Sequence, residues 1–383
     1  MRCLYLLLAV LATACSGTDV SGASTKQGAV RIGNAFTATP VADFQEPWAM
    51  TFLPDGRLLV SEKKGALKLL DVNSKRVGNI SGVPQVAYGG QGGFGDVILH
   101  PQFAANSIVY VSYSEPGQGD NDRDTSGAAV ARARLELDRD GGGSLQDLEV
   151  VWRQVPKVAS RGHWGHRLAF GPDGMLWITS SERQQFTPAQ DMKSNLGKVV
   201  RLKEDGSVPD DNPFYAQGGV TAQIWSLGHR NLLGIAFAPD GRLYTHEMGP
   251  AGGDELNIIE KTANYGYPIV SNGNHYDGSD IPDHSTRPEF RAPLVTWNPV
   301  ISPAGFIIYS GKMFPDWVGD GFIGGLSSES LVRVEFGNGT AREAQRFDMG
   351  RRIREVEQGP DGAIWLLEDQ RNLTGGRLLK LTP

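Results

Sequence analysis

One histidine in the chain stands where an imidazole could act as a general base. His163 lies in residues 161–167, between Gly162 and Gly165, directly ahead of an apolar stretch that reads as a strand. Small neighbours leave the ring sterically open, and an imidazole titrates near neutral pH, which suits a group that takes a proton from a substrate. The alternative is a pair of surface histidines, since His166 follows closely. The residues alone leave both interpretations open.

Two further segments carry cationic and amide side chains in patterns that suit an anion. Residues 225–231 end in Arg230 and Asn231, fixed donors that could hold an anionic or carbonyl oxygen, although such a pair is also a common loop staple. Arg352 and Arg354 are two residues apart, so on a strand both guanidinium groups share one face. Parallel guanidinium groups repel unless an anion lies between them. This favours a small polycarboxylate or phosphate ligand, with a solvated charged edge as the alternative.

A turn-rich segment, residues 249–255, carries oxygen atoms of the kind that hold calcium. Gly249 and Pro250 sit in a turn that exposes main-chain carbonyl groups, and Asp254 and Glu255 add carboxylates. Calcium prefers such hard oxygen ligands, but the spacing matches no EF-hand. The sequence also lacks the signatures of His/Cys zinc sites, phosphate-binding loops and nucleophile elbows. Hydride chemistry in this chain therefore cannot rely on a Rossmann unit.

One phrase recurs along the chain and predicts the scaffold that positions these residues. It consists of an apolar strand, a Pro-Asp-Gly turn and a second apolar strand. Proline presets φ for the second position of a turn, and Asp and Gly suit the positions that follow, so each phrase predicts a hairpin corner. The phrase occurs at residues 50–60, 168–178, 235–244 and 356–366, with looser copies at 96–110 and 305–334.

Six copies, spaced roughly 45 to 75 residues apart, predict an all-β fold, a six-bladed β-propeller of four-stranded antiparallel blades. A pair of β-sandwiches is the alternative. The last strand, 377–381, would pair with the early strand 30–36 and close the ring without an open edge. The longest segments between copies, residues 116–144, 183–225 and 249–303, would then converge at the axis and carry the chemistry.

The first residues predict export. Arg2 precedes an apolar run, residues 4–14, that is too short to span a bilayer but suits a signal peptide. Small residues before Cys15 resemble a bacterial lipoprotein cleavage box; a plain signal peptide with an incidental cysteine is the alternative. We therefore expect a signal peptide at 1–14 and a flexible tether at 15–29.

Residues 30–383 form the expected propeller catalytic domain, located in the periplasm and lipid-anchored to the outer membrane. Both cysteines of the chain, Cys3 and Cys15, precede it, so this domain has no disulfide and no cysteine metal ligand. The formal net charge of −6 argues against a nucleic-acid partner. The lipid anchor would be its only attachment to a membrane.

Taken together, these segments resemble the soluble quinoprotein sugar dehydrogenases, the glucose/sorbosone family that uses pyrroloquinoline quinone (PQQ) and includes aldose sugar dehydrogenases. The resemblance runs in order from about residue 41 to residue 381. Its motifs are Gly90-Gln91-Gly92-Gly93 with His100-Pro101, His163 with Arg167, Gly228-His229-Arg230-Asn231, Gly249-Pro250 with Asp254-Glu255-Leu256-Asn257, Asn264-Tyr265-Gly266, Trp297 with Pro299, and Arg352-Ile353-Arg354-Glu355-Val356.

The resemblance implies an enzyme that oxidises aldoses at the anomeric carbon to lactones, with PQQ and calcium as cofactors and an external electron acceptor. It implies that His163 is the base, assisted by Arg230 and Gln91. It implies a quinone site made of Gln91, Arg230, Asn231, Tyr276, Trp297, Arg352 and Arg354. For calcium it implies the carbonyl groups of Gly249 and Pro250, and a second, structural site at Glu255 and Tyr265.

Four departures from the family pattern put activity and substrate in question. Ser327 replaces a lysine that family members offer to the cofactor, and His166 occupies a place that is usually small. Gly162 stands where some members have an acid beside the base, so His163 is expected to lack an orienting partner. Residues 181–183, Ser-Glu-Arg, replace a Gly-Asp pair.

The alternative is therefore an exported propeller lipoprotein that binds a sugar or polysaccharide without turnover. A hydrolytic propeller such as a lactonase ranks third, because no inner carboxylate cluster is visible in the sequence.

Overall fold

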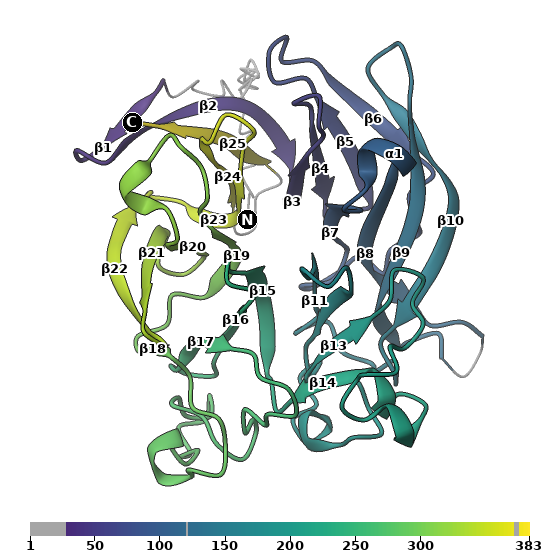
Figure 1. Cartoon of the computed structure of the whole chain (residues 1–383), viewed down its shortest axis with the longest axis vertical. Helices are drawn as coiled ribbons and strands as arrows, with labels where there is room; N and C mark the ends of the chain where they lie inside the picture. Colours follow the sequence, from purple (N-terminus) through teal and green to yellow (C-terminus); the bar gives the residue numbers. More distant parts are fainter. Residues whose placement is uncertain (1–27, 120–121, 371–374) are drawn as a thin grey trace, which may run out of the picture.

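β-Strands make up most of the regular secondary structure in the described part of the chain, and their sheets are set around a common centre (Figure 1). The computed structural model describes residues 28–119, 122–370 and 375–383. Three sheets have four strands each, in chain order. They are β11 (Gly165–Phe170), β12 (Leu176–Ser180), β13 (Lys198–Leu202) and β14 (Ile224–Leu227); β15 (Asn231–Phe237), β16 (Leu243–Met248), β17 (Asp254–Ile258) and β18 (Val295–Trp297); and β19 (Pro303–Ile308), β20 (Gly321–Gly325), β21 (Ser330–Gly337) and β22 (Thr340–Asp348).

A larger sheet of eight strands consists of two antiparallel halves. They are β3 (Pro47–Phe52), β4 (Leu58–Glu62), β5 (Ala66–Leu70) and β6 (Val77–Ser81), and then β7 (Phe94–Leu99), β8 (Ile108–Pro116), β9 (Ser126–Leu137) and β10 (Gly143–Arg153). The halves join where β6 and β10 pair in parallel through Ile80 and Ser81 of β6. The fifth sheet has the order β1 (Val30–Ile32), β2 (Phe36–Gln45), β25 (Gly375–Thr382), β24 (Ile364–Asp369) and β23 (Arg352–Gln358).

Helical structure in the described ranges is limited to short turns. These are α1 (Phe103–Asn106), η1 (Thr187–Gln190), η2 (Tyr215–Gln217), η3 (Thr221–Gln223), η4 (His284–Thr286) and η5 (Pro315–Trp317). None of the helices among the described residues is long and apolar enough to cross a membrane. The prediction of an all-β chain with four-stranded antiparallel sheets is confirmed.

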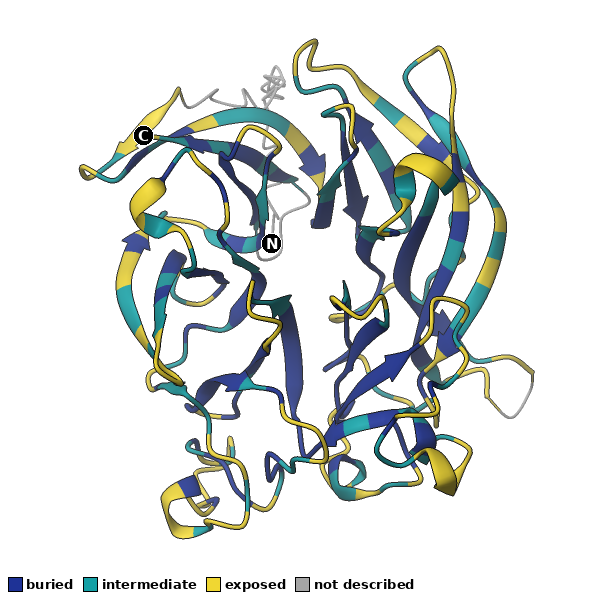
Figure 2. Cartoon of the chain, viewed as in Figure 1, coloured by how far each residue is buried: buried dark blue, intermediate teal, exposed yellow. Residues whose placement is uncertain are grey.

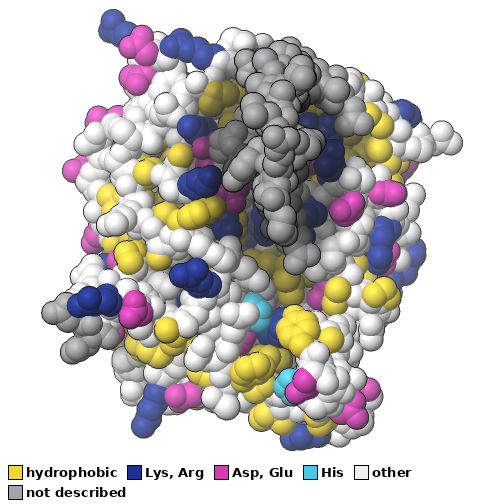
Figure 3. Space-filling model, turned by 180° about the vertical axis from the view of Figure 1, so that it is seen from behind, with side chains coloured by type: hydrophobic (Ala, Val, Ile, Leu, Met, Phe, Trp, Pro, Cys, Tyr) yellow, Lys and Arg dark blue, Asp and Glu magenta, His cyan; other side chains and the backbone are white. Residues whose placement is uncertain are grey.

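Six strands, here called the inner strands, form a closed cycle of contacts at the centre of the molecule. β3 contacts β7, β7 contacts β11, and the cycle continues through β15, β19 and β23 back to β3. Figure 2 shows buried residues concentrated in the strands around the centre and exposed residues at the outer edges. Viewed from the opposite side, basic and acidic side chains are interspersed over the surface (Figure 3).

The Pro-Asp-Gly turns form the predicted hairpin corners for a definable reason. In each turn the aspartate side chain accepts a hydrogen bond from the backbone N–H two residues later, at 3.0–3.1 Å. The glycine that follows has φ between 76° and 85°, a region that side chains with a Cβ rarely adopt. The four turns contain Asp55 and Gly56, Asp173 and Gly174, Asp240 and Gly241, and Asp361 and Gly362. In the two looser copies, α1 and η5 take the place of the turn.

The closing strand differs from the sequence prediction. Residues 377–381 lie in β25 as expected, but β25 pairs with β2, from Thr37 opposite Thr382 to Gln45 opposite Gly375. Among the described strands, β1 pairs with β2 alone, so residues 30–36 were the wrong partner. Pro40 made β2 hard to recognise, because proline cannot donate to a ladder and is tolerated mainly at edges and bulges. In the structure Pro40 sits next to a register shift of this pairing.

Each innermost strand is irregular near its beginning. The register shifts occur between Pro47 and Ala49, Phe94 and Val97, Gly165 and Leu168, Leu232 and Gly234, Pro303 and Phe306, and Ile353 and Glu355. A bulge bends its strand and re-aims side chains, and bulges are common beside active sites. The same irregularity in all six inner strands indicates that a site lies where these strands begin.

Candidate active site

A cavity of about 790 Å³ opens where the inner strands begin. It brings together the beginnings of β3, β11, β15 and β23 with residues of the loops between strands. Among its lining residues are Trp48, Lys63, Gln91, His166, Asn231, Tyr276, Ser327, Arg352, Arg354 and Asp369. A second hollow, of about 820 Å³, lies beside β1, η5 and β22 and contains none of the predicted site residues.

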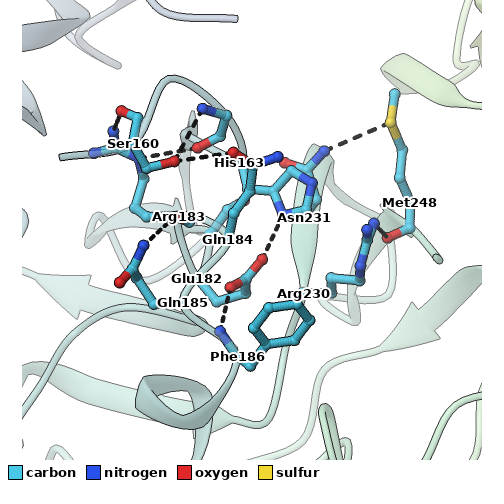
Figure 4. Close-up of polar contacts among 12 residues, drawn as sticks. Ser160, His163, Glu182, Arg183, Gln184, Gln185, Phe186, Arg230, Asn231 and Met248 are labelled. Atoms are coloured by element: carbon cyan, nitrogen blue, oxygen red, sulfur yellow. Dashed lines mark hydrogen bonds and ion pairs between the residues drawn. The ribbon is translucent and has the colours of Figure 1, made fainter. Parts of the chain in front are cut away.

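The candidate base, His163, has an orienting partner after all. Its Nδ1 pairs with Oε1 of Glu182, and the other carboxylate oxygen of Glu182 accepts the backbone N–H of Phe186 at 2.7 Å (Figure 4). A neutral imidazole has one N–H, so donation from Nδ1 leaves Nε2 as an acceptor. The expectation that His163 lacks a partner is therefore wrong. Glu182 lies in the Ser-Glu-Arg departure, which the sequence alone did not connect with His163.

Burial sets the protonation state of this pair. It lowers the pKa of His163, which is 6% exposed. The Glu182 carboxylate opposes this shift, while the charges of Arg230 and Arg183 add to it. Burial alone would raise the pKa of Glu182, but its hydrogen bonds and the His163 charge outweigh burial and lower it. Around neutral pH the pair is therefore a neutral imidazole beside an ionised carboxylate, the state that a base requires.

Arg183 fixes the loop that carries His163. Its side chain is fully buried and stacks over the ring of Trp164, 3.4 Å from the ring centroid. The guanidinium donates to the carbonyl groups of Gly162 at 3.0 Å and of Ser160. Burial lowers the pKa of Arg183 to about 9, so it remains charged at neutral pH. A buried cation held by main-chain oxygens pins this loop in one conformation.

The backbone around the pair is in a strained region. His163, Arg183, Gln184 and Phe186 have φ between 49° and 62°, which non-glycine residues seldom adopt. Residues in such conformations cluster at functional sites, where the surrounding contacts hold them. Here one of those contacts comes from Gln91, whose side-chain oxygen accepts the backbone N–H of His163 at 2.7 Å.

Arg230 and Asn231 lie on the other side of His163, as Figure 4 shows. Arg230 donates to the carbonyl groups of Met248 at 2.9 Å and Gly249 at 2.6 Å, and to the Tyr276 hydroxyl at 3.3 Å. Nε of Arg230 and Oδ1 of Asn231 are buried, and neither has a hydrogen-bond partner in the described part of the chain. Buried polar atoms without partners are uncommon in native proteins and call for an explanation.

Arg352 and Arg354 do have an anion between them, and the protein supplies it. Oδ2 of Asp369, at the end of β24, lies 3.3 Å from Nη2 of Arg352 and 3.2 Å from Nε of Arg354. Burial would raise the pKa of Asp369, but the two arginines outweigh burial and lower it. Sequence reasoning missed Asp369 because the pairing of β23 with β24 brings it opposite Arg352.

Two aromatic predictions have different outcomes. Tyr276 lies at the cavity rim, where 77% of its surface is exposed. Trp297 is not among the residues that line the cavity; it packs in the core with Leu256 and Ile301. Its Nε1 donates to Glu343 at 2.7 Å. Two other tryptophans, Trp48 and Trp164, line the cavity instead.

His166 does not add a second titrating group. Its ring lines the cavity and stacks on Trp48, with 5.1 Å between centroids. Burial lowers the pKa of His166 to about 3, and the charge of Arg167 contributes to this. The ring therefore stays neutral over the usual range of pH and acts as part of the aromatic wall. Its Nδ1 is 2.7 Å from the Ser112 hydroxyl.

The predicted calcium ligands gather beside Arg230. Gly249, Glu255 and Tyr265 line a small cavity together with Glu247, and Pro250 is buried next to Gly249. Burial raises the pKa of Glu255 well above its ordinary value, and the charge of Glu247 adds to this. The Gly249 carbonyl accepts from Arg230. Within the described ranges, no three His, Cys, Asp or Glu side chains are grouped to hold a metal ion.

An inner carboxylate cluster, which the sequence did not reveal, lies at the centre of the strand cycle. Arg167 pairs there with Glu355, and its Nη1 is 3.6 Å from Oδ1 of Asp96. Burial raises the pKa of Glu355 to about 7, although Arg167 opposes the shift. Burial also raises the pKa of Glu357 to about 8, with the charge of Glu355 contributing. These carboxylates lie around the Arg167 guanidinium and have a structural role.

The chain is similar to known sugar dehydrogenases in sequence and in fold. The family model of glucose/sorbosone dehydrogenases matches residues 44–380. The aldose sugar dehydrogenase YliI of Escherichia coli K12 is 38% identical over 88% of this chain and 90% of its own. The apo-form crystal structure of an E. coli aldose sugar dehydrogenase has a TM-score of 0.82 at 37% identity, covering 91% of this chain and 99% of that one.

A structure described as the PQQ-bound form of a Streptomyces coelicolor aldose sugar dehydrogenase is more distant. It has a TM-score of 0.74 at 27% identity and covers 92% of this chain and 99% of that chain. The family match extends from β2 to β25 and includes every strand that contributes to the cavity. The chain belongs to the glucose/sorbosone dehydrogenase family.

Proposed function

We propose that this protein is a PQQ-dependent sugar dehydrogenase that oxidises aldoses at the anomeric carbon to lactones. The observation that carries the proposal is the His163–Glu182 pair. His163 is a buried, neutral candidate base next to Gln91 and Trp164, which line the cavity that also contains Arg352 and Arg354. The relatives support the reaction class, since two of them, at 38% and 37% identity, are called aldose sugar dehydrogenases.

The cavity residues fit a planar quinone with three carboxylates. Trp48 and Trp164 contribute aromatic surface to the cavity wall. Arg352 and Arg354 offer fork-shaped donors for carboxylates, with Asp369 as the anion that they hold in this structure. The unpaired Nε of Arg230 is a donor for a quinone oxygen. When bound, PQQ supplies the hydride acceptor, a chemistry that no side chain provides.

The protein's own residues then handle the proton and the developing charge. Nε2 of His163 takes the proton from the anomeric hydroxyl as the C1–H bond gives up its hydride, so C1 becomes a carbonyl carbon. Glu182 stabilises the imidazolium that forms and keeps the ring oriented. Arg230 and Asn231 place fixed dipoles where negative charge develops, which costs no reorganisation during the reaction.

Calcium is part of the proposal as a second cofactor. The carbonyl groups of Gly249 and Pro250 would hold one ion, and Glu255 with Tyr265 a second, structural ion. The raised pKa of buried Glu255 supports this, because a divalent cation would stabilise the carboxylate form. The Gly249 carbonyl already accepts a hydrogen bond from Arg230 at 2.6 Å, and its second lone pair is available to the first ion.

Binding without turnover is the weaker interpretation. It drew its support from Ser327, whose hydroxyl donates to the Val300 carbonyl at 3.3 Å at the cavity edge. A protein that only binds sugar has no need of a buried neutral base held by Glu182 and a strained loop. The lactonase interpretation is also disfavoured, because the inner carboxylates surround Arg167.

We propose further that the sheets form six blades, each beginning with one strand of the central contact cycle, in a catalytic domain of residues 30–383. A signal peptide at 1–14 and a tether at 15–29 would direct the protein to the periplasm and anchor it by lipid to the outer membrane. The signal peptide and most of the tether lie outside the described residues. An external electron acceptor would reoxidise the cofactor.

The first test is reconstitution. Purified protein given PQQ and calcium should oxidise aldoses in a dye-linked assay, and neither cofactor alone should suffice. His163→Ala should abolish turnover while PQQ binding is retained, because a base acts on the substrate. Activity with nicotinamide cofactors, or none across a panel of aldoses, would overturn the proposal.

The pH profile tests the His163–Glu182 pair. Activity should be present above the pKa of His163, which burial holds below 6.5, and should be lost as the pH falls through it. Glu182→Gln removes the charge that supports the imidazolium, so the acid limb should move to lower pH. We expect kcat to fall about 10²-fold or more, and PQQ affinity to change little. Glu149→Gln, at an exposed site, is the control. A Glu182→Gln profile identical to that of the wild type would refute this role.

Mass spectrometry tests the anchor. Protein extracted from membranes should begin at Cys15 and carry a diacylglyceryl adduct. A Cys15→Ser variant should lose the adduct and leave the membrane fraction. An unmodified periplasmic protein cleaved elsewhere would show that the signal is of the plain type.

A further inference from the structure

Lys63 is a cation of the cavity wall that sequence reasoning did not single out. It follows β4 directly and lines the same cavity as Arg352, Arg354 and Ser327. Its Nζ donates to the carbonyl group of Gly90 at 2.6 Å. The ammonium group also lies 5.6 Å from the ring centroid of Tyr88.

The backbone of Lys63 is held on both sides, so the side chain starts from a fixed point. Its N–H donates to the carbonyl of Glu46 at 3.0 Å, and its carbonyl accepts from Phe94 at 2.8 Å. A Cβ on Gly93 would come within 2.1 Å of this carbonyl and 2.7 Å of the Lys63 side chain. Only glycine therefore fits beside Lys63. The loop is shaped to bring this side chain to the cavity.

Charge distinguishes Lys63 from the two arginines. Arg352 and Arg354 share the carboxylate of Asp369. No carboxylate of the described residues lies within ion-pair distance of Lys63 Nζ. The nearby Glu46 is instead 3.6 Å from Lys64 and accepts from the Tyr88 hydroxyl at 2.8 Å.

Partial burial lowers the pKa of Lys63, and the positive charge of Arg354 contributes, while the charges of Glu46 and Asp369 oppose the shift. An additional anion would stabilise this ammonium group. Three N–H donors allow a lysine to keep its bond to Gly90 and still bind a ligand. The cavity wall can therefore bind one more carboxylate in addition to the Asp369 side chain.

We propose that Lys63, together with Arg354, binds a carboxylate of the quinone cofactor and supplies the cation that Ser327 does not. This inference rests on the proposed PQQ-dependent function and assigns one further binding residue to that site. Ser327 and Lys63 line the same cavity from different sheets. Lys63 therefore keeps a cation in the cavity wall, at a position other than that of Ser327.

The test is the dissociation constant of PQQ, measured by isothermal titration calorimetry without turnover. Lys63→Gln should weaken binding about 10- to 100-fold, the range for one charge-assisted hydrogen bond. Lys63→Arg should restore most of the affinity. Lys64→Gln is the matched control, since Lys64 is adjacent, lies 5.8 Å from the same Tyr88 ring and has a half-exposed side chain. Its affinity should stay within twofold of the wild type.

If Lys63 has only a structural role, in which its hydrogen bond to the Gly90 carbonyl holds that loop in place, other results are expected. Lys63→Gln would then lower the melting temperature and leave PQQ affinity unchanged, which overturns the inference. Ser327→Lys in the Lys63→Gln background should recover affinity if charge in the wall is what matters; failure to recover it also counts against the inference. If the wild type binds no PQQ at all, the proposed function fails, and this inference fails with it.

Discussion

The structure depends on how one buried cation is neutralised at the centre of the strand cycle. Arg167, on β11, pairs with Glu355 on β23, donates to the Leu233 carbonyl on β15 at 3.0 Å, and stacks on Trp48 of β3 at 4.0 Å. One guanidinium thus joins four of the inner strands. Removal of the Arg167 guanidinium would leave the buried carboxylates without a counter-charge. This would lower the free energy of unfolding far more than the loss of a surface ion pair. This contact also fixes Trp48, which lines the cavity.

The site is built on that rigid centre from the irregular beginnings of the inner strands. The inner strands have bulges beside the cavity, and the candidate base His163 lies among loop residues of positive φ. Buried charges are held at defined distances: Glu182 on His163, Asp369 on Arg354, and Arg183 on the main-chain oxygens of its loop. These groups are oriented before any ligand arrives, as electrostatic catalysis requires.

Much of the fold could be predicted from sequence because its corners are local. The Pro-Asp-Gly turns need only the aspartate cap and a glycine of positive φ. What could not be predicted depends on distant pairing. Asp369 meets Arg352 only through the β23–β24 register, and Lys63 reaches the wall only through the strand cycle. His163 was recognisable as a candidate base, but its partner Glu182 is visible only once the hairpin of β11 and β12 closes. Trp297 was wrongly assigned to the cofactor site, because a tryptophan side chain packs in a hydrophobic core as readily as against a ligand.

We propose above all that the cavity at the beginnings of the inner strands holds the quinone beside His163. A crystal structure of the protein with PQQ and calcium tests this most directly. We expect the quinone rings in the cavity lined by Trp48, with carboxylates on Arg352 and Arg354 and the quinone oxygens toward Arg230. PQQ bound in the hollow beside β1 and β22, or not bound to the crystalline protein, would contradict the account.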